Sequence, residues 1–87
     1  MWGRVSEYFR KYPAQEKIAN LLMEYGLRVK PDGIYCGEIK IQDQAIADVV
    51  GGDRRIVSAT IDTILKNPKL DKIFSKLSPV AHLKDVA

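Results

Sequence analysis

The stretch 43–65, DQAIADVVGGDRRIVSATIDTIL, constrains the fold more than any other part of the chain. Its apolar residues recur at helical spacing on both sides of a glycine pair, Gly51-Gly52. Glycine adopts positive φ without steric cost, so a tight corner is expected there. Asp53 follows the corner, and its carboxylate is a good N-cap. We therefore predict one helix over 43–50 and a second from Asp53 to about residue 67.

The residue types within this stretch fit two helices that cross closely. Ala47 is small, Gly51 follows four residues later at the corner, and Val57 and Ser58 come six and seven residues after that. At about 100° per residue, one arc of the second helix carries Ile56, Val57, Thr60, Ile61, Ile64 and Leu65. The opposite arc carries Arg55, Ser58, Ala59, Asp62 and Lys66, with Arg54 at the border. This is the pattern of a helix-turn-helix motif over 43–66.

Side chains on the outer arc indicate contact with double-stranded DNA. In a helix-turn-helix the second helix, here 53–66, enters the major groove and its N-terminal residues reach base edges. Arginine suits guanine or phosphate, and a hydroxyl suits either a phosphate or a base. The residues expected to face the bases are Arg54, Arg55, Ser58 and Asp62. The residues expected to hold phosphates are Lys66, Lys69 and Lys72.

Two of these positions depart from a basic outer face. Asp62 carries a carboxylate that phosphates repel, although it could pair with Arg55 or Lys66, or accept from a cytosine amino group. Ala59 stands where such regulators often carry a basic residue. A second hypothesis therefore remains, in which the helix-turn-helix is a protein-interaction or dimerisation module that binds no DNA. That module would expose an apolar patch around Trp2, Tyr8 and Tyr12.

Composition narrows the class of protein. Eighty-seven residues are expected to form one domain, 1–87, with a modest core. We find no phosphate-binding glycine loop and no nucleophile with a base at useful spacing, so we do not expect an enzyme. No cofactor and no metal are expected either, because one cysteine, Cys36, and one histidine, His82, make an incomplete zinc site.

The net charge of +3 is unevenly distributed along the chain. Residues 31–53 carry one basic and five acidic groups, whereas 54–66 carry three basic groups and one acidic group. Positive charge therefore returns where the second helix begins, as expected of a nucleic-acid face. The sequence has neither a membrane-spanning apolar run nor a secretory signal, so a cytoplasmic location without membrane contact is predicted.

The segments before the motif complete a mainly α domain. We predict a helix over 3–11 with an apolar stripe of Trp2, Val5, Phe9 and Tyr12, then a helix from Pro13 that Gly26 closes. The core positions expected in that helix are Ala14, Ile18, Leu21, Leu22 and Tyr25. Alternating residues around the turn signal Pro31-Asp32-Gly33 predict a β-hairpin over 27–41.

This hairpin gives the domain a winged-helix-like composition in an unusual order. The wing of winged helix-turn-helix proteins usually follows the second helix, whereas this hairpin precedes the motif. Arg28, Lys30 and Lys40 could contact phosphates, but Asp32 and Glu38 argue against a strongly basic wing. After the motif, Asn67-Pro68 opens a helix expected to run to about Leu77.

Four segments together resemble one archaeal family, the predicted regulators of amino acid metabolism. They are YPAQEKIANLLMEYGLRV, GIYCGEIKIQDQAIADVVGGDRRIVSATIDTIL, NPKLDKIF and PVAHLKDVA. The resemblance covers nearly the whole chain, and it implies the N-terminal helix-turn-helix region of a protein with a C-terminal ACT domain. It also implies transcription regulation, with any small-molecule sensing left to the ACT domain. Residues 79–87 would then be a linker toward that domain. A homodimer is expected because dimers place two such helices in successive major grooves.

Overall fold

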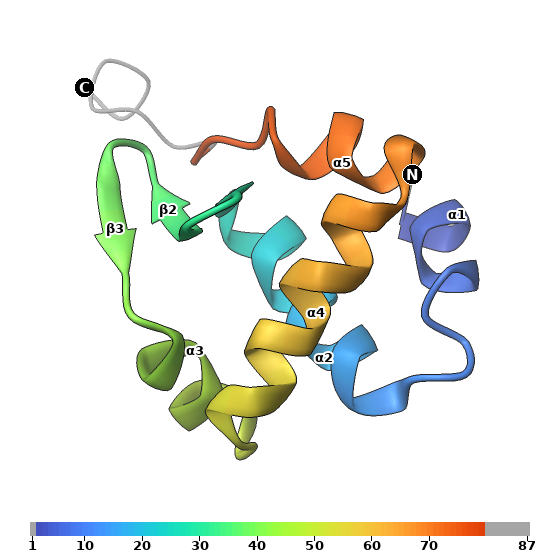
Figure 1. Ribbon diagram of the computed structural model, residues 1–87, viewed down its shortest axis with the longest axis horizontal. Coiled ribbons are helices and arrows are strands. Elements are labelled where there is room, and N and C mark those ends of the chain that lie inside the picture. Colours follow the sequence, from blue (N-terminus) through green and yellow to red (C-terminus); the bar gives the residue numbers. More distant parts are fainter. Residues whose placement is uncertain (1, 80–87) are drawn as a thin grey trace.

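A three-stranded sheet interrupts a run of helices in this chain. The structure, a computed structural model, describes residues 2–79, without the side chain of Trp2. The elements in order are α1 (Trp2–Glu7), α2 (Pro13–Tyr25), β1 (Arg28–Lys30), β2 (Gly33–Cys36), β3 (Ile39–Ile41), α3 (Asp43–Val50), α4 (Arg54–Lys66) and α5 (Pro68–Phe74). Figure 1 shows α4 crossing the middle of the molecule, with the sheet and α1 at opposite ends of the view. Residues 80–87 of the expected linker lie outside the described residues.

Helix α4 is central because its apolar arc meets almost every other element. It packs against α2, α3, α5 and β1. Val57, Thr60 and Ile64 are fully buried, and they share one core with Phe9, Leu22, Ile34, Leu70 and Phe74. The Thr60 hydroxyl donates to the Ile56 carbonyl at 2.7 Å, which satisfies the one polar side chain of this buried face. The predicted inner arc is thus confirmed, although Ile56 and Leu65 are only partly buried.

The sheet is antiparallel, in the order β1-β2-β3. Val29 pairs with Ile34, and Ile34 pairs with Ile41, so one face carries aliphatic side chains toward the core. The prediction of a single hairpin was too simple. Gly37, at φ 62°, starts a two-residue turn that pairs Cys36 with Ile39, so residues 34–41 fold back on themselves. Ile39 lies near the tip of this second hairpin and is largely exposed.

The first helix is shorter than the predicted 3–11. Helix α1 ends at Glu7, and residues 8–12 continue in tight turns, such as Tyr12 N–H to the Phe9 carbonyl at 2.8 Å. From Tyr8 to Arg10 the N–H groups donate to carbonyls three residues back and not four. Pro13 then disfavours helical geometry at the residue before it. Tyr12 accordingly has φ −132° and ψ 73°. Its ring is half exposed and does not extend the apolar stripe formed by Val5 and Phe9.

Three other expectations need correction. Helix α5 ends at Phe74 and not near Leu77. The Lys76 N–H donates to the Ile73 carbonyl three residues back, and Pro79 lacks the N–H that a longer helix would use. Ala14 and Tyr25 are exposed, so neither is a core residue of α2. Both lie at the ends of α2, beyond the elements that cover its buried face of Ile18, Ala19 and Leu22.

Candidate nucleic-acid interface

The corner between α3 and α4 has the geometry that the sequence predicted. Gly51 adopts φ 72° and ψ 28°, a left-handed conformation that strains residues with a Cβ. The Ala47 carbonyl accepts from the N–H groups of Gly51 and Gly52, the latter at 2.9 Å. Ala47 itself is fully buried, so the two helices cross closely at this residue. These contacts hold the start of α4 beside the end of α3.

The first turn of α4 is capped by Asp53. Its Oδ1 accepts from the Arg55 backbone N–H at 2.7 Å, and its Oδ2 lies 2.9 Å from a terminal nitrogen of the Arg55 guanidinium. The Arg55 side chain, and after it the backbone N–H, lowers the pKa of Asp53 to about 2. The same pairing raises the pKa of Arg55. Arg55 is therefore paired with the cap, although its side chain remains 87% exposed to solvent.

The remaining residues expected to face bases differ in their surroundings. Arg54 is exposed, and within residues 2–79 its side chain makes no ion pair. The Ser58 hydroxyl donates to Asp43 Oδ2 at 3.3 Å, which links α4 to the first turn of α3. Asp62 is exposed, and the predicted pairing with Arg55 or Lys66 does not occur. The four residues share one side of α4, and among them Arg54 is the one cation without an ion-pair partner in the part of the chain that the structure describes.

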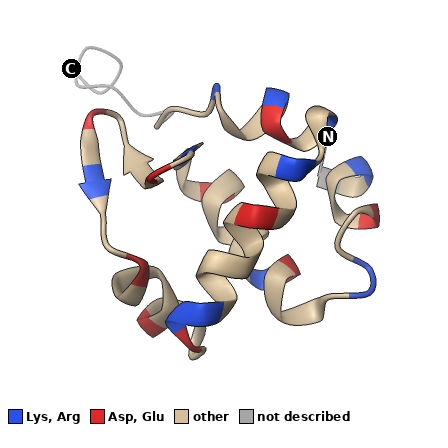
Figure 2. Ribbon diagram, viewed as in Figure 1, with Lys and Arg blue, Asp and Glu red and all other residues tan. Residues whose placement is uncertain are grey.

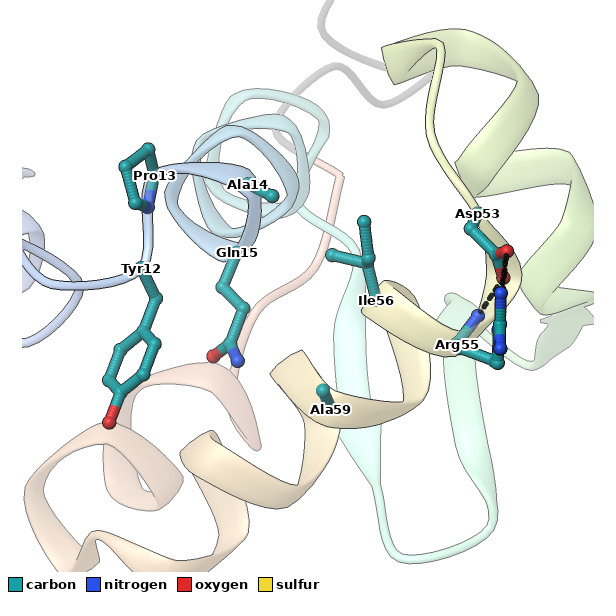
Figure 3. A pocket seen from close by; sticks show the side chains of 8 residues that line it. All are labelled: Tyr12, Pro13, Ala14, Gln15, Asp53, Arg55, Ile56 and Ala59. Atoms are coloured by element: carbon teal, nitrogen blue, oxygen red, sulfur yellow. Dashed lines mark hydrogen bonds and ion pairs between the residues drawn. The ribbon is translucent and has the colours of Figure 1, made fainter.

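Two grooves flank the N-terminal half of α4, and they differ in chemistry. The first, which we call the α2-side groove, has a volume of about 500 Å³ and is mostly apolar. Figure 3 shows Tyr12, Pro13 and Ala14 on one side of it, with Ile56 and Ala59 on the other. The second, which we call the sheet-side groove, has a volume of about 440 Å³. Its lining is less apolar than that of the first groove and includes Asp32, Lys40, Ile41, Asp43, Gln44, Arg54 and Ser58.

Arg55 lines both grooves, so it lies on the ridge between them. A helix that stands between two hollows has the shape needed to enter a groove of a partner molecule. The start of α4, with Arg54 and Arg55, forms the basic part of this ridge (Figure 2). The geometry thus offers a protruding helix start that carries arginine and hydroxyl side chains.

The three lysines expected to hold phosphates lie at the other end of α4. Lys66 is in its last turn, and Lys69 and Lys72 are on α5; all three are exposed. Arg54 and Lys66 are the first and last of the 13 residues of α4, about 18 Å apart along the helix axis, so the structure does not bring these lysines to the arginines. Asp62 lies between them along α4, and Figure 2 shows an acidic segment between the two basic ends of this helix. The basic residues of the candidate site therefore form two separate groups.

Sequence reasoning did not assign Asp43 to this surface. It lies 15 residues before Ser58, and no local pattern indicates that the two side chains meet. Only the crossing of α3 and α4 brings the carboxylate beside the outer arc. The same crossing places β3 nearby, so that Lys40 and Arg54 line one groove. The outer surface is consequently of mixed charge, with Asp32 and Asp43 among its basic residues.

Other kinds of site are not evident in the described residues. Between residues 2 and 79, no group of three His, Cys, Asp or Glu side chains is placed to hold a metal ion. No helix in that range is long and apolar enough to cross a membrane. Comparisons with protein-family models, with curated proteins and with solved structures find no match.

Proposed function

We propose that this chain binds double-stranded DNA, with the N-terminal half of α4 in the major groove, and that it acts in transcriptional regulation. The observation that carries the proposal is the ridge at the start of α4, where Arg54 and Arg55 stand between two grooves. An α-helix fits the major groove of B-DNA, and arginine there can contact guanine or phosphate. The corner at Gly51 supports the proposal because it orients α4 by its close contact with α3.

Each residue of the ridge has a distinct part in this proposal. Arg54 contacts guanine or a phosphate directly, because no ion pair within residues 2–79 restrains it. Arg55 contacts DNA by exchanging Asp53 for a phosphate or base, and the exchange costs little because exposed ion pairs stabilise a protein weakly. Ser58 and Asp62 discriminate between bases, Asp62 by accepting from a cytosine amino group. Lys66, Lys69 and Lys72 contact phosphates that flank the groove.

The test is the salt dependence of duplex binding. Affinity for a random-sequence duplex is measured by fluorescence anisotropy for the wild type and for Arg54→Ala/Arg55→Ala. Loss of two phosphate or base contacts should reduce the slope of log affinity against log salt by about 2. The matched control is Arg4→Ala/Arg10→Ala, which removes the same charge from exposed positions in and after α1 and should leave most of the slope. Absence of binding at about 50 mM salt, or an equal loss in both variants, contradicts the proposal.

A dimer would be the expected form of such a regulator. Two copies related by a twofold axis could place their α4 helices in successive major grooves, about 34 Å apart. Analytical ultracentrifugation across the concentrations used for anisotropy measures this directly. A monomer that binds DNA with no dependence on half-site spacing would contradict the homodimer and leave DNA binding itself in place.

The second candidate function is a protein-interaction module, and the α2-side groove is the observation that favours it. Tyr12 is half exposed there beside Ala14, Ile56 and Ala59, a concave apolar surface rather than a basic one. The variant Tyr12→Ala separates the two functions because it removes apolar surface from this groove at a residue outside α4, and it leaves the outer arc and both arginines in place. Loss of self-association or of partner binding, with no salt-dependent DNA binding by the wild type, would favour the module.

A further inference from the structure

The sheet carries three cationic side chains, and each of them has a different partner in the structure. Arg28 donates from Nε to the Leu77 carbonyl at 3.0 Å, so its guanidinium anchors the segment after α5. Lys30 Nζ lies 4.5 Å from the centre of the Tyr35 ring, a cation–π contact. Lys40 alone of the three lines the sheet-side groove, which it shares with Arg54 and Ser58. The three cations that the sequence left equivalent therefore have different surroundings.

Several contacts position the Lys40 side chain. A Cβ at Gly33 would lie 2.9 Å from Lys40 Cε, so the lysine stem crosses the space that this glycine leaves open. Lys40 pairs with Tyr35 across β2 and β3. The Asp32 carboxylate accepts from the Tyr35 hydroxyl at 2.6 Å and lies 3.7 Å from Lys40 Nζ. A side chain already held in one region loses less conformational entropy when it binds.

The charges of the groove limit what it can hold. Its cations are Lys40, Arg54 and Arg55; Lys40 pairs with Asp32 at 3.7 Å and Arg55 with Asp53 at 2.9 Å. Its carboxylates are Asp32, which also accepts from Tyr35, and Asp43, which accepts from Ser58. Three cations and two carboxylates leave one net positive charge in the lining, and Lys40 can exchange Asp32 for a phosphate because exposed ion pairs are weak. Such a groove suits one phosphate and not a row of them.

We propose that Lys40 and Arg54 together bind one backbone phosphate of the DNA whose major groove receives α4. The sheet would then contact DNA although it precedes the helix pair in the chain. This inference rests on the proposed function, and it adds a contact from β3 that the helix pair alone does not provide. Lys40 is a phosphate-binding residue here, whereas Lys30 on the same sheet is not.

The test compares two variants of equal charge, Lys40→Gln and Lys30→Gln. Loss of one phosphate contact should reduce the salt slope by about 0.9 and lower the affinity at 0.1 M salt by about eightfold. We expect this for Lys40→Gln, and a change of less than about twofold for Lys30→Gln, whose cation faces Tyr35. Lys40→Arg keeps the charge and should keep the slope. Circular dichroism and denaturation midpoints of all variants establish that the fold is intact.

A second measurement examines whether the two cations share a phosphate. The affinity losses of Lys40→Gln and Arg54→Gln should combine to less than their product, whereas those of Lys30→Gln and Arg54→Gln should multiply. Multiplicative losses for Lys40 and Arg54, or equal effects of Lys40→Gln and Lys30→Gln, overturn the shared site while wild-type DNA binding stands. A wild type without salt-dependent affinity overturns the shared site together with the proposed function.

Discussion

The two faces of α4 differ in how strongly the chain specifies them. The inner face consists of side chains such as Val57, Thr60 and Ile64, all fully buried and in contact with several elements. The outer face holds Arg54, Ser58 and Asp62, which are exposed and make at most one weak polar contact. Packing therefore determines where α4 lies, whereas exposed side chains determine what it can bind. Three consecutive residues show the change: Asp62 lies on the outer face, Thr63 at the border and Ile64 in the core.

The largest difference in the free energy of unfolding is expected between Ile64→Ala and Asp62→Ala. Ile64 is fully buried, and removing its side chain leaves a cavity that should lower the free energy of unfolding by about 2–5 kcal/mol. Asp62 is exposed and without an ion pair within residues 2–79, so its variant should stay within about 0.5 kcal/mol of the wild type. Urea denaturation of both proteins measures this. Similar losses would show that the two faces are not distinct.

The next largest loss of stability is expected for a substitution at the corner before α4. Gly51→Ala forces a residue with a Cβ into φ 72° and should cost about 1–2 kcal/mol, although a Cβ there meets nothing within 4 Å. Gly52→Ala is the matched control. Gly52 has no positive φ, and its added Cβ would make ordinary contacts at 3.6 Å and 3.8 Å with Val50 and Ile56. Equal denaturation midpoints for the two variants would argue that the corner carries no backbone constraint.

A substitution at the border between the two faces of α4 should change the free energy of unfolding less. The Thr63 hydroxyl lies 2.7 Å from Gln15 Oε1 on α2 and 3.0 Å from the Ala59 carbonyl, so its one proton has two acceptors within reach. Thr63→Val keeps the shape and removes the donor, so the free energy of unfolding should fall by about 0.5–1.5 kcal/mol. A double-mutant cycle with Gln15→Ala isolates the pair. A coupling energy indistinguishable from zero would mean that the contact between Thr63 and Gln15 contributes no stability.

The smallest effect concerns the ion pair at the exposed start of α4. Arg55→Gln removes the largest cause of the low pKa of Asp53, so this pKa should rise from about 2 toward the ordinary 3.8. It should stay below 3.8 because the backbone N–H of residue 55 still donates to the carboxylate. The stabilisation from Asp53 is present above pH 3.8 and is lost as the pH falls to about 2. In Arg55→Gln the lower limit of this pH range rises with the pKa of Asp53, so the range becomes narrower.

Carboxyl carbon shifts followed by NMR during an acid titration report the Asp53 pKa directly. Arg54→Gln is the control, because Arg54 lowers the pKa of Asp53 less than Arg55 does, so its loss should change this pKa less. An Asp53 pKa that does not move in Arg55→Gln would mean that the guanidinium is already extended into solution and available to DNA.

Much of the motif was predictable because its signals are local. The helix 43–50 and its left-handed glycine are confirmed, as is the buried arc of α4. Asp53 and Asn67 cap α4 and α5 with hydrogen bonds to nearby backbone N–H groups. Each of these features depends on residues within one or two helical turns. Such features can be read from spacing and residue type.

The errors arose where a neighbour or a turn decided the outcome. Tyr12 has the spacing of an apolar stripe, but α1 ends at Glu7 and Pro13 keeps Tyr12 out of helical geometry. Gly37 turns one expected strand into two. Ala14 has helical core spacing, yet no element covers it and it lines an open groove. Periodicity states which face of a helix is apolar, but not how far the covering elements extend.

The sequence alone determined the helix–glycine–helix segment, its caps and the sign of charge along it, because these depend on short-range sterics and hydrogen bonds. Only the tertiary structure decided which charged side chains become neighbours. Asp43 meets Ser58 and Lys40 shares a groove with Arg54, because α3 crosses α4 and β3 leads directly into α3. Those long-range pairings depend on how whole faces pack, and residue spacing along the chain does not encode them locally.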